Sequence, residues 1–313
     1  MTQVVDALEL IPADTGAGSC VAIGKFDGLH LGHQAILRRL VEEARADGLR
    51  TVVVTFRNNP LSYLKPEACP QPLMSPEQRL EAFEEAGIDL CVMVEFDADF
   101  ARIPAEDFVA DVLVGRLGAK HVIMGADFRF GHRGAGDGEL LAELGERFGF
   151  TAEVVDWVGH GDDQVSSSRV RAAVAAGDVD AAARMLGRAP AVRGEVVRGD
   201  ARGREIGFPT ANLGGRIEGL VPADGVYAGW TTIEGERRIA AISVGNNPTF
   251  TPEGQSRVEA FLLDFDGDLY GKRMRVEFAH RLRGMERYDS LDALLEQMDA
   301  DVQRTRDLLG DTD

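Results

Sequence analysis

The spacing of apolar segments changes once along the chain, near Arg188-Ala189-Pro190, and this change constrains the fold more than any other feature. Before it, apolar strands alternate with helical patterns, which is typical of a doubly wound parallel sheet. After it, short apolar segments are separated by turn residues, which favours an antiparallel barrel or sandwich. We therefore predict an α/β domain over residues 1–187 and a β domain over residues 188–313, with the boundary at Arg184–Ala191.

Local signals place the individual elements. The predicted strands are 20–23, 51–56, 90–94 and 121–125 in the first domain and 192–197, 226–232, 239–244, 258–265 and 274–278 in the second. Ser75, Pro76 and Gln78 have the order of a helix N-terminus with a capping box. Ser290 is the expected cap of a terminal helix, whose predicted apolar face contains Leu291, Leu294, Leu295, Met298 and Val302.

Composition and charge disfavour several classes of protein. The 313 residues suit two domains, and the net charge of −18 argues against a basic nucleic-acid-binding surface. No apolar run reaches the roughly 18 residues of a membrane span, and the N-terminus lacks the pattern of a secretory signal. Cys20, Cys69 and Cys91 show no C-x-x-C spacing, so we expect reduced thiols and a cytoplasmic protein. An anionic substrate must then be held locally, by backbone N–H groups, a few arginines and a metal ion.

A glycine-bearing turn joins the first apolar strand to a helix between Gly24 and His33. Such a turn presents backbone N–H groups to an anion at the helix N-terminus. His30 and His33 can donate hydrogen bonds to phosphate oxygens, and Gly32 lets a nucleotide approach the backbone. This suits a reaction in which charge builds on an α-phosphate and pyrophosphate leaves. Structural or capping histidines are the alternative, and a metal site is disfavoured because no third ligand lies at suitable spacing.

A second anion cradle is predicted at the start of the short helical run 172–176. Three hydroxyls precede this run together with two arginines: Ser166, Ser167, Ser168, Arg169 and Arg171. Hydroxyls, backbone N–H groups and guanidinium groups at a helix start can hold phosphates. An ordinary serine N-cap with solvated arginines is the alternative.

In the second domain, a glycine- and arginine-rich run ends in Gly207-Phe208-Pro209-Thr210-Ala211-Asn212. Phosphate transfer from ATP to an alcohol needs a polyphosphate cradle, Mg²⁺ and a base near the hydroxyl. Thr210 and Asn212 supply neutral oxygen ligands that suit Mg²⁺. The residues able to wrap phosphates are Gly199, Gly203 and Gly207, with Arg202 and Arg204 between them. Viewed alone, such a hairpin is more often structural.

The motifs of the first domain resemble the adenylyltransferase domain of the bacterial bifunctional riboflavin kinase/FMN adenylyltransferase (FAD synthetase) family, an H-x-G-H nucleotidylyltransferase. The matching motifs are Gly24-x-Phe26-Asp27-Gly28-x-His30-x-Gly32-His33, Gly125-x-Asp127-Phe128-Arg129-Phe130-Gly131 and Ser166-Ser167-Ser168-Arg169-x-Arg171. The resemblance implies direct attack of the FMN phosphate on the α-phosphate of ATP. It implies that His30, His33 and Arg169 are catalytic and that ATP is bound by Gly24, Phe26, Asp27, Gly28, Gly32, Ser166, Ser167 and Ser168.

A flavin and nucleotide cleft is implied at Gly125, Asp127 and Phe128, which follow a predicted strand. The family's Phe-Asp-Pro-His-Pro segment reads Phe56-Arg57-Asn58-Asn59-Pro60 in this chain. Asn59 therefore replaces a histidine that contacts phosphate in the family, and its amide can still donate a hydrogen bond. This departure leaves one alternative open, a monofunctional riboflavin kinase with an impaired or altered N-terminal domain.

The second domain resembles the riboflavin kinase domain of the same family over most of residues 188–309. The matching motifs, in family order, are Gly207–Asn212, Ala223–Tyr227, Ser243–Phe250, Val258-Glu259 and Asp268–Gly271. The resemblance implies that Thr210 and Asn212 ligate Mg²⁺ and that Glu259 is the catalytic base for the riboflavin 5′-hydroxyl. It implies an ATP site made by Gly199, Gly203, Arg204, Gly207, Phe208, Pro209, Thr210, Asn212, Asn247 and Thr249.

The resemblance thus implies an enzyme that converts riboflavin to FMN and FMN to FAD, using ATP and Mg²⁺. Its partners would be small molecules rather than nucleic acid or a membrane, and an oligomer is possible. A flavin-binding regulatory protein without turnover is the alternative from another class.

Overall fold

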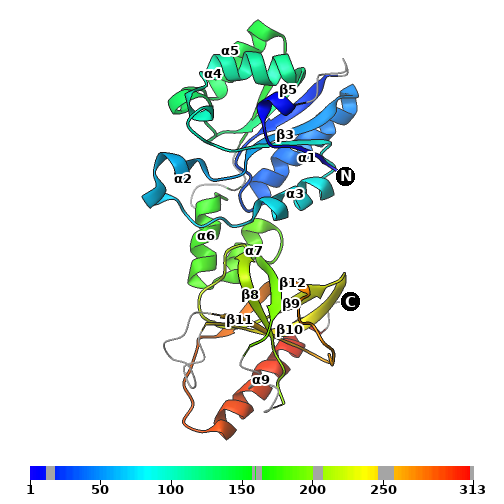
Figure 1. Cartoon of the computed structure of the whole chain (residues 1–313), viewed down its shortest axis with the longest axis vertical. Helices are drawn as coiled ribbons and strands as arrows, with labels where there is room; N and C mark the ends of the chain where they lie inside the picture. The colour runs from blue at the N-terminus through cyan, green and yellow to red at the C-terminus, as the bar shows by residue number, and fades with distance from the viewer. Residues whose placement is uncertain (12–17, 157–158, 160–163, 200–206, 246–256, 311–313) are drawn as a thin grey trace. The chain divides into compact units, whose positions relative to one another are not determined.

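The computed structural model describes residues 1–11, 18–156, 159, 164–199, 207–245 and 257–310 (Figure 1). The chain divides into two compact units, Met1–Ser166 and Ser167–Asp313. The functional boundary predicted between residues 187 and 188 stays a prediction. None of the helices in the described part of the chain is long and apolar enough to cross a bilayer.

Unit 1 is built on a six-stranded parallel sheet with the strand order β1-β4-β3-β2-β5-β6. The strands are β1 Gln3–Val5, β2 Ser19–Ile23, β3 Arg50–Phe56, β4 Leu90–Val94, β5 Ala119–Gly125 and β6 Thr151–Val155. The helices are η1 Leu8–Leu10, α1 Leu31–Asp47, α2 Pro60–Leu64, η2 Pro66–Ala68, α3 Pro76–Glu85, η3 Phe100–Arg102, α4 Ala105–Asp107, η4 Phe108–Arg116, η5 His132–Gly134 and α5 Gly138–Phe148. This arrangement confirms the predicted doubly wound sheet.

Alternation of side chains along the central strand β2 explains the two covering layers. Val21 and Ile23 face one core, which η4 and α5 complete, whereas Cys20 and Ala22 face the other, which α1 and α3 complete. Burial raises the pKa of the Cys20 thiol to about 12. The predicted capping box of α3 is confirmed, since the Ser75 side chain accepts from the Gln78 N–H.

The order of the strands creates a switch point beside β2. From β2 the chain moves to β3 and then β4 on one side, and it returns to β5 on the other side. Ligands in such sheets bind beyond the carboxyl ends of the strands at this point. The turns at Gly24 and Gly125 both lie there, because β2 ends at Ile23 and β5 ends at Gly125.

Unit 2 is a closed antiparallel barrel with the strand order β10-β11-β8-β7-β12-β9, which confirms the predicted barrel. Its strands are β7 Ala191–Val197, β8 Ala211–Glu218, β9 Gly225–Ile233, β10 Glu236–Gly245, β11 Arg257–Leu262 and β12 Arg273–Arg283. Its helices are α6 Ser167–Ala176, α7 Val179–Leu186 and α9 Leu291–Leu309. Strand β8 was missed in the sequence because Gly214 and Gly215 interrupt its apolar pattern.

Helices α6 and α7 are attached to the barrel by polar contacts. Nδ1 of His280 lies 2.7 Å from Oδ1 of Asp180, and Nη1 of Arg281 donates to the Ala176 carbonyl at 3.2 Å. In addition, Val179 of α7 is fully buried and belongs to the same apolar cluster as the barrel core. These contacts explain why the two helices belong to the second compact unit.

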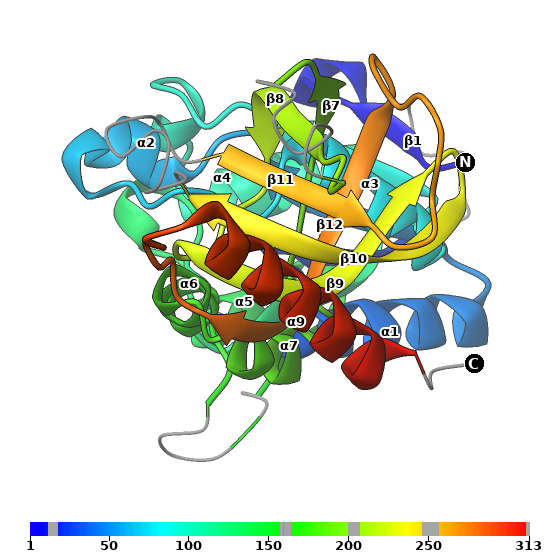
Figure 2. The ribbon, with the colours of Figure 1, turned by 90° about the horizontal axis from the view of Figure 1, so that it is seen from below.

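The terminal helix α9 packs across β9 and β10 (Figure 2). Ser290 caps it as predicted, because the Ser290 side chain accepts from the Ala293 N–H at 3.2 Å. The predicted apolar face is wrong at Leu291, which is 49% exposed. The buried residues of α9 are Leu294, Asp301, Thr305 and Leu309. Asp301 is buried because its carboxylate pairs with Arg283 of β12 at 2.7 Å.

We predict that Asp301→Asn destabilises unit 2 by about 2 kcal/mol, because it leaves the partly buried Arg283 guanidinium without its carboxylate. Hydrogen exchange followed by mass spectrometry on peptides of β9, β12 and α9 measures the loss. Asp264→Asn is the matched control: it breaks the other ion pair of α9, with Arg306, but at an exposed site. Equal protection in the two variants would contradict the prediction.

Candidate functional site

The turn between β2 and α1 is held in an unusual backbone conformation. Phe26 and Leu29 have φ values of 51° and 44°, and Gly28 has φ of 84°. A Cβ atom at Gly28 would lie 2.6 Å from a Leu73 methyl carbon, so only glycine fits. Oδ1 of Asp27 accepts from the Leu73 N–H at 2.9 Å, which ties the turn to the segment before α3. Asp27 therefore has a structural contact in addition to its predicted place in the ATP site.

The two histidines of the turn lie together at the start of α1. His30 is the N-cap residue, and its ring stacks on the ring of His33 with centroids 3.8 Å apart. Phe26 is fully buried and packs against His33 with centroids 5.3 Å apart, so its side chain supports the site from within the core. Burial, and then the charges of His30 and Arg79, lower the pKa of His33 well below its ordinary value. His33 is therefore a neutral imidazole at neutral pH.

The predicted cleft residues lie at the carboxyl ends of β3 and β5. Asn59 caps α2, because its Oδ1 accepts from the Leu61 N–H at 3.0 Å. This contact leaves its amide nitrogen as the group that could donate to a phosphate. Asp127 is exposed just after β5, and a Cβ atom at Gly125 would lie 3.5 Å from Oδ1 of Asp127.

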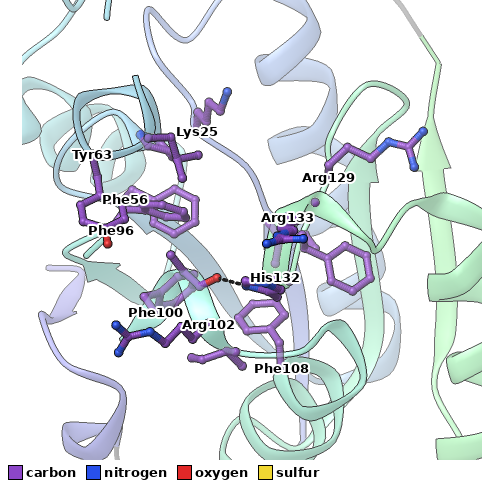
Figure 3. Close-up of a pocket in the computed structure, with 18 of the residues that line it drawn as sticks. Lys25, Phe56, Tyr63, Phe96, Phe100, Arg102, Phe108, Arg129, His132 and Arg133 are labelled. Atoms are coloured by element: carbon purple, nitrogen blue, oxygen red, sulfur yellow. Dashed lines mark hydrogen bonds between the residues drawn. The ribbon is translucent and has the colours of Figure 1, made fainter. Parts of the chain in front are cut away.

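An aromatic cavity of about 650 Å³ opens at this end of the sheet (Figure 3). Phe56 packs edge-to-face against Phe96 and Phe100, with centroids 5.3 and 5.2 Å away. Phe128, predicted for the cleft, lines the cavity, as do the cationic side chains of Lys25, Arg102, Arg129 and Arg133. Sequence reasoning missed the other aromatic residues because they come from separate strands, helices and connecting segments, and no spacing relates them.

In unit 2 the structure brings Thr210, Asn212 and Glu259 together. Glu259 of β11 lies directly opposite Asn212 of β8 in the antiparallel ladder. The Thr210 hydroxyl donates to Oε2 of Glu259 at 3.2 Å, and Nδ2 of Asn212 lies 3.4 Å from the Thr210 carbonyl oxygen. Residues that are 49 positions apart in the sequence therefore form one cluster of oxygen-bearing side chains.

Close packing around this cluster explains why a glycine and an aromatic residue stand at two neighbouring positions. A Cβ atom at Gly199 would lie 2.7 Å from Nδ2 of Asn212, so glycine is needed for this approach. Phe208 is buried and packs against Phe261 with centroids 5.3 Å apart. Gly207 and Pro209 are exposed. The predicted site residues Gly203, Arg204, Asn247 and Thr249 lie outside the described residues.

The chemistry of the cluster fits a hard cation. A hydroxyl, a carboxamide and a carboxylate are oxygen donors of the kind that Mg²⁺ takes in proteins, usually with phosphate and water. Among the described residues, no group of three or more His, Cys, Asp or Glu side chains is placed to hold a metal by itself. A cation here would take its remaining oxygen ligands from bound phosphate and water.

The chain divides into its two compact units within the sequence of the predicted serine cradle. Ser166 ends unit 1, while Ser167, Ser168 and Arg169 form the first turn of α6 in unit 2. Ser168 and Arg169 are exposed, and Nη2 of Arg171 lies 3.4 Å from the Ser168 hydroxyl. Their role in binding phosphate stays a prediction.

Two family models match the chain, one to each part. Residues 13–169 match the family described as FAD synthetase, and residues 186–309 match the family described as riboflavin kinase. Both matches agree with the resemblance seen in the motifs.

Curated relatives and a solved structure match over nearly the whole chain. Bifunctional riboflavin kinase/FMN adenylyltransferases are 40% identical in Pseudomonas fluorescens, covering 92% of this chain and 93% of the relative, and 34% identical in Bacillus subtilis, covering 92% and 91%. A crystal structure of a Streptococcus pneumoniae protein described as a macrolide-efflux protein is 33% identical, with a TM-score of 0.87 over 97% of this chain and 98% of that chain. The chain belongs to the bifunctional riboflavin kinase/FMN adenylyltransferase family.

Proposed function

We propose that this chain phosphorylates riboflavin to FMN with MgATP and then transfers AMP from a second ATP to FMN, which gives FAD and pyrophosphate. The kinase reaction is assigned to the barrel of unit 2. The adenylyl transfer is assigned to the β2–α1 turn of unit 1, and a phosphate-binding role of residues 166–169 is proposed from the motif resemblance alone. The substrates are small molecules, and the cytoplasmic location expected from the sequence stays part of the proposal.

The observation that carries the kinase assignment is the contact of Thr210 with Glu259. The Glu259 carboxylate accepts a hydrogen bond from the Thr210 hydroxyl at 3.2 Å. Glu259 also lies opposite Asn212 in the antiparallel ladder. In the proposed step the riboflavin 5′-oxygen attacks the γ-phosphorus of ATP, its proton passes to Glu259, and ADP leaves. Mg²⁺ would be held by Thr210, Asn212 and the phosphates, and it would neutralise part of the negative charge of the phosphates.

The adenylyl transfer needs a phosphate site next to a flavin site. The stacked His30 and His33 supply hydrogen-bond donors at a helix start, where backbone N–H groups also favour an anion. In the proposed step an oxygen of the FMN phosphate attacks the α-phosphorus of ATP, and the bond from that phosphorus to the pyrophosphate oxygen breaks. No proton transfer to a side chain is required, so imidazoles that donate hydrogen bonds and orient the phosphates suffice.

The aromatic cavity supports a flavin at the same end of the sheet. Its volume of about 650 Å³ and its phenylalanine lining suit a planar ring system, which stacks well against aromatic side chains. Residues from the ends of β2 and β3 line it, including Lys25 and Phe56. The flavin ring would then lie beyond the same strands whose turns carry the histidines and Asn59.

Glu259→Gln should lower the kcat of FMN formation by a factor of roughly 100 to 10,000, because an amide cannot accept the hydroxyl proton. FAD formation from supplied FMN should be unchanged. Chromatographic separation of riboflavin, FMN and FAD measures both reactions. Glu195→Gln, at an exposed position of β7, is the matched control and should leave both reactions at the wild-type rate. Near-normal kinase turnover in Glu259→Gln would show that the base is another group.

His33→Ala should have the opposite effect, lowering FAD formation by a factor of roughly 100 or more because a donor to the phosphates is lost. Riboflavin phosphorylation by the same variant should remain, because that reaction is assigned to unit 2. Wild-type protein supplied with FMN and ATP should produce FAD and pyrophosphate. No FAD from the wild-type protein would favour the monofunctional kinase, and no ADP release with riboflavin would favour a flavin-binding regulator.

A further inference from the structure

A buried arginine, Arg79, joins the ends of two central strands of unit 1. Arg79 belongs to the first turns of α3, and its side chain is only 6% exposed. Its Nη1 donates to the Lys25 carbonyl at 3.0 Å, just beyond β2. Its Nη2 donates to the carbonyls of Phe56 at 2.7 Å and Arg57 at 3.0 Å, at the end of β3. One guanidinium therefore binds three backbone carbonyls of two neighbouring strand ends.

The partners of Arg79 are unusual for a buried cation. Buried charges are normally compensated by an opposite charge, yet within the described residues the Arg79 guanidinium donates to backbone carbonyls and to the Thr55 hydroxyl. Burial lowers the pKa of Arg79, and the charge of Asp27 partly opposes this effect. Since arginine keeps its proton in proteins, the site retains a positive charge beneath the β2–α1 turn.

The carbonyls bound by Arg79 lie at the edge where the phosphates are proposed to bind. The carbonyl groups at the carboxyl ends of parallel strands carry negative partial charge, which repels a triphosphate. A guanidinium that donates to three of them removes this repulsion and adds one positive charge. Lysine could supply the charge, but its single ammonium group lacks the planar fork that reaches separate carbonyls.

The same side chain acts on the histidine pair. Within the part of the chain that the structure describes, His30 and Arg79 are the charged or titratable groups that act on His33, and the charge of Asp27 acts in turn on Arg79. The nearby cation disfavours a protonated ring, after the larger effect of burial. Arg79 thus favours the neutral form of His33 in addition to holding the strand ends.

We propose that Arg79 is a positioning residue of the adenylyl transfer, whose buried guanidinium fixes the ends of β2 and β3 and shields their carbonyl oxygens so that the triphosphate can bind there. This inference rests on the proposed function of the β2–α1 turn. It assigns a task to a residue that touches neither ATP nor the reacting atoms.

The test compares wild-type protein with Arg79→Gln and Arg79→Lys as full chains. Arg79→Gln should lower kcat/KM for ATP in FAD formation by about 10- to 100-fold, mainly through a higher KM, because charge-assisted hydrogen bonds are lost. It should weaken the binding of pyrophosphate, used as a probe, by a similar factor. Riboflavin phosphorylation by the same protein should stay at the wild-type rate. Arg39→Gln, which removes an exposed arginine of unit 1, is the matched control and should change neither reaction.

A titration of the histidine rings by NMR separates this role from simple packing. Loss of the neighbouring cation favours protonation, so the pKa of His33 should rise toward its ordinary value in Arg79→Gln. Arg79→Lys keeps the charge but loses the fork, so His33 should titrate as in the wild type while the KM for ATP still rises. Arg79→Lys also keeps the test possible if Arg79→Gln does not fold.

Three outcomes decide the inference. A wild-type KM for ATP and wild-type pyrophosphate affinity in either folded variant would overturn it. A lower melting temperature with unchanged KM and unchanged His33 titration would reduce Arg79 to a packing residue and also overturn it. If wild-type protein forms no FAD, the proposed function fails separately, and the pyrophosphate comparison still tests whether Arg79 supports an anion site.

Discussion

A polyphosphate must be bound by a chain whose own net charge is −18. This constraint explains why both sites gather groups that attract phosphate. Long-range attraction cannot help, so positive potential has to be created within a few ångströms of each phosphate. In unit 1 a helix start, two imidazoles and a buried guanidinium are gathered at the ends of β2 and β3. In unit 2 oxygen-bearing side chains are gathered where a cation could join them to phosphate. The acidic surface elsewhere is therefore compatible with the proposed substrates.

The two units position the residues of their sites in different ways. A parallel sheet leaves strand ends open at its switch point, so unit 1 can place turns from β2, β3 and β5 around one edge. Aromatic residues at and after the ends of β3, β4 and β5 line a cavity there. A closed barrel has no such open edge, and unit 2 instead uses register: the antiparallel ladder sets Glu259 opposite Asn212, and the preceding turn adds Thr210. The chemistry follows from these placements, since one reaction requires a base and the other requires only oriented phosphates.

The sequence predicted the fold class well, because period-2 and helical patterns report which side chains are buried. It failed at β8, where paired glycines hide the strand, at the exposed Leu291, and at the edge strand β6, whose residues are only partly buried. The contact of Thr210 with Glu259 could be expected from motif resemblance alone, not from spacing. Neither the aromatic cavity nor the role of Arg79 was predictable, because each depends on loops and strand ends that meet only in three dimensions.

The central claim is that one chain holds nucleotide at two separate places, and a crystal structure with Mg²⁺, a non-hydrolysable ATP analogue and FMN tests it most directly. We predict one analogue with its phosphates at the β2–α1 turn beside His30 and His33, the FMN ring in the aromatic cavity, and a second analogue beside Thr210 and Asn212. Nucleotide density at neither turn, or at surfaces away from both, would contradict the account.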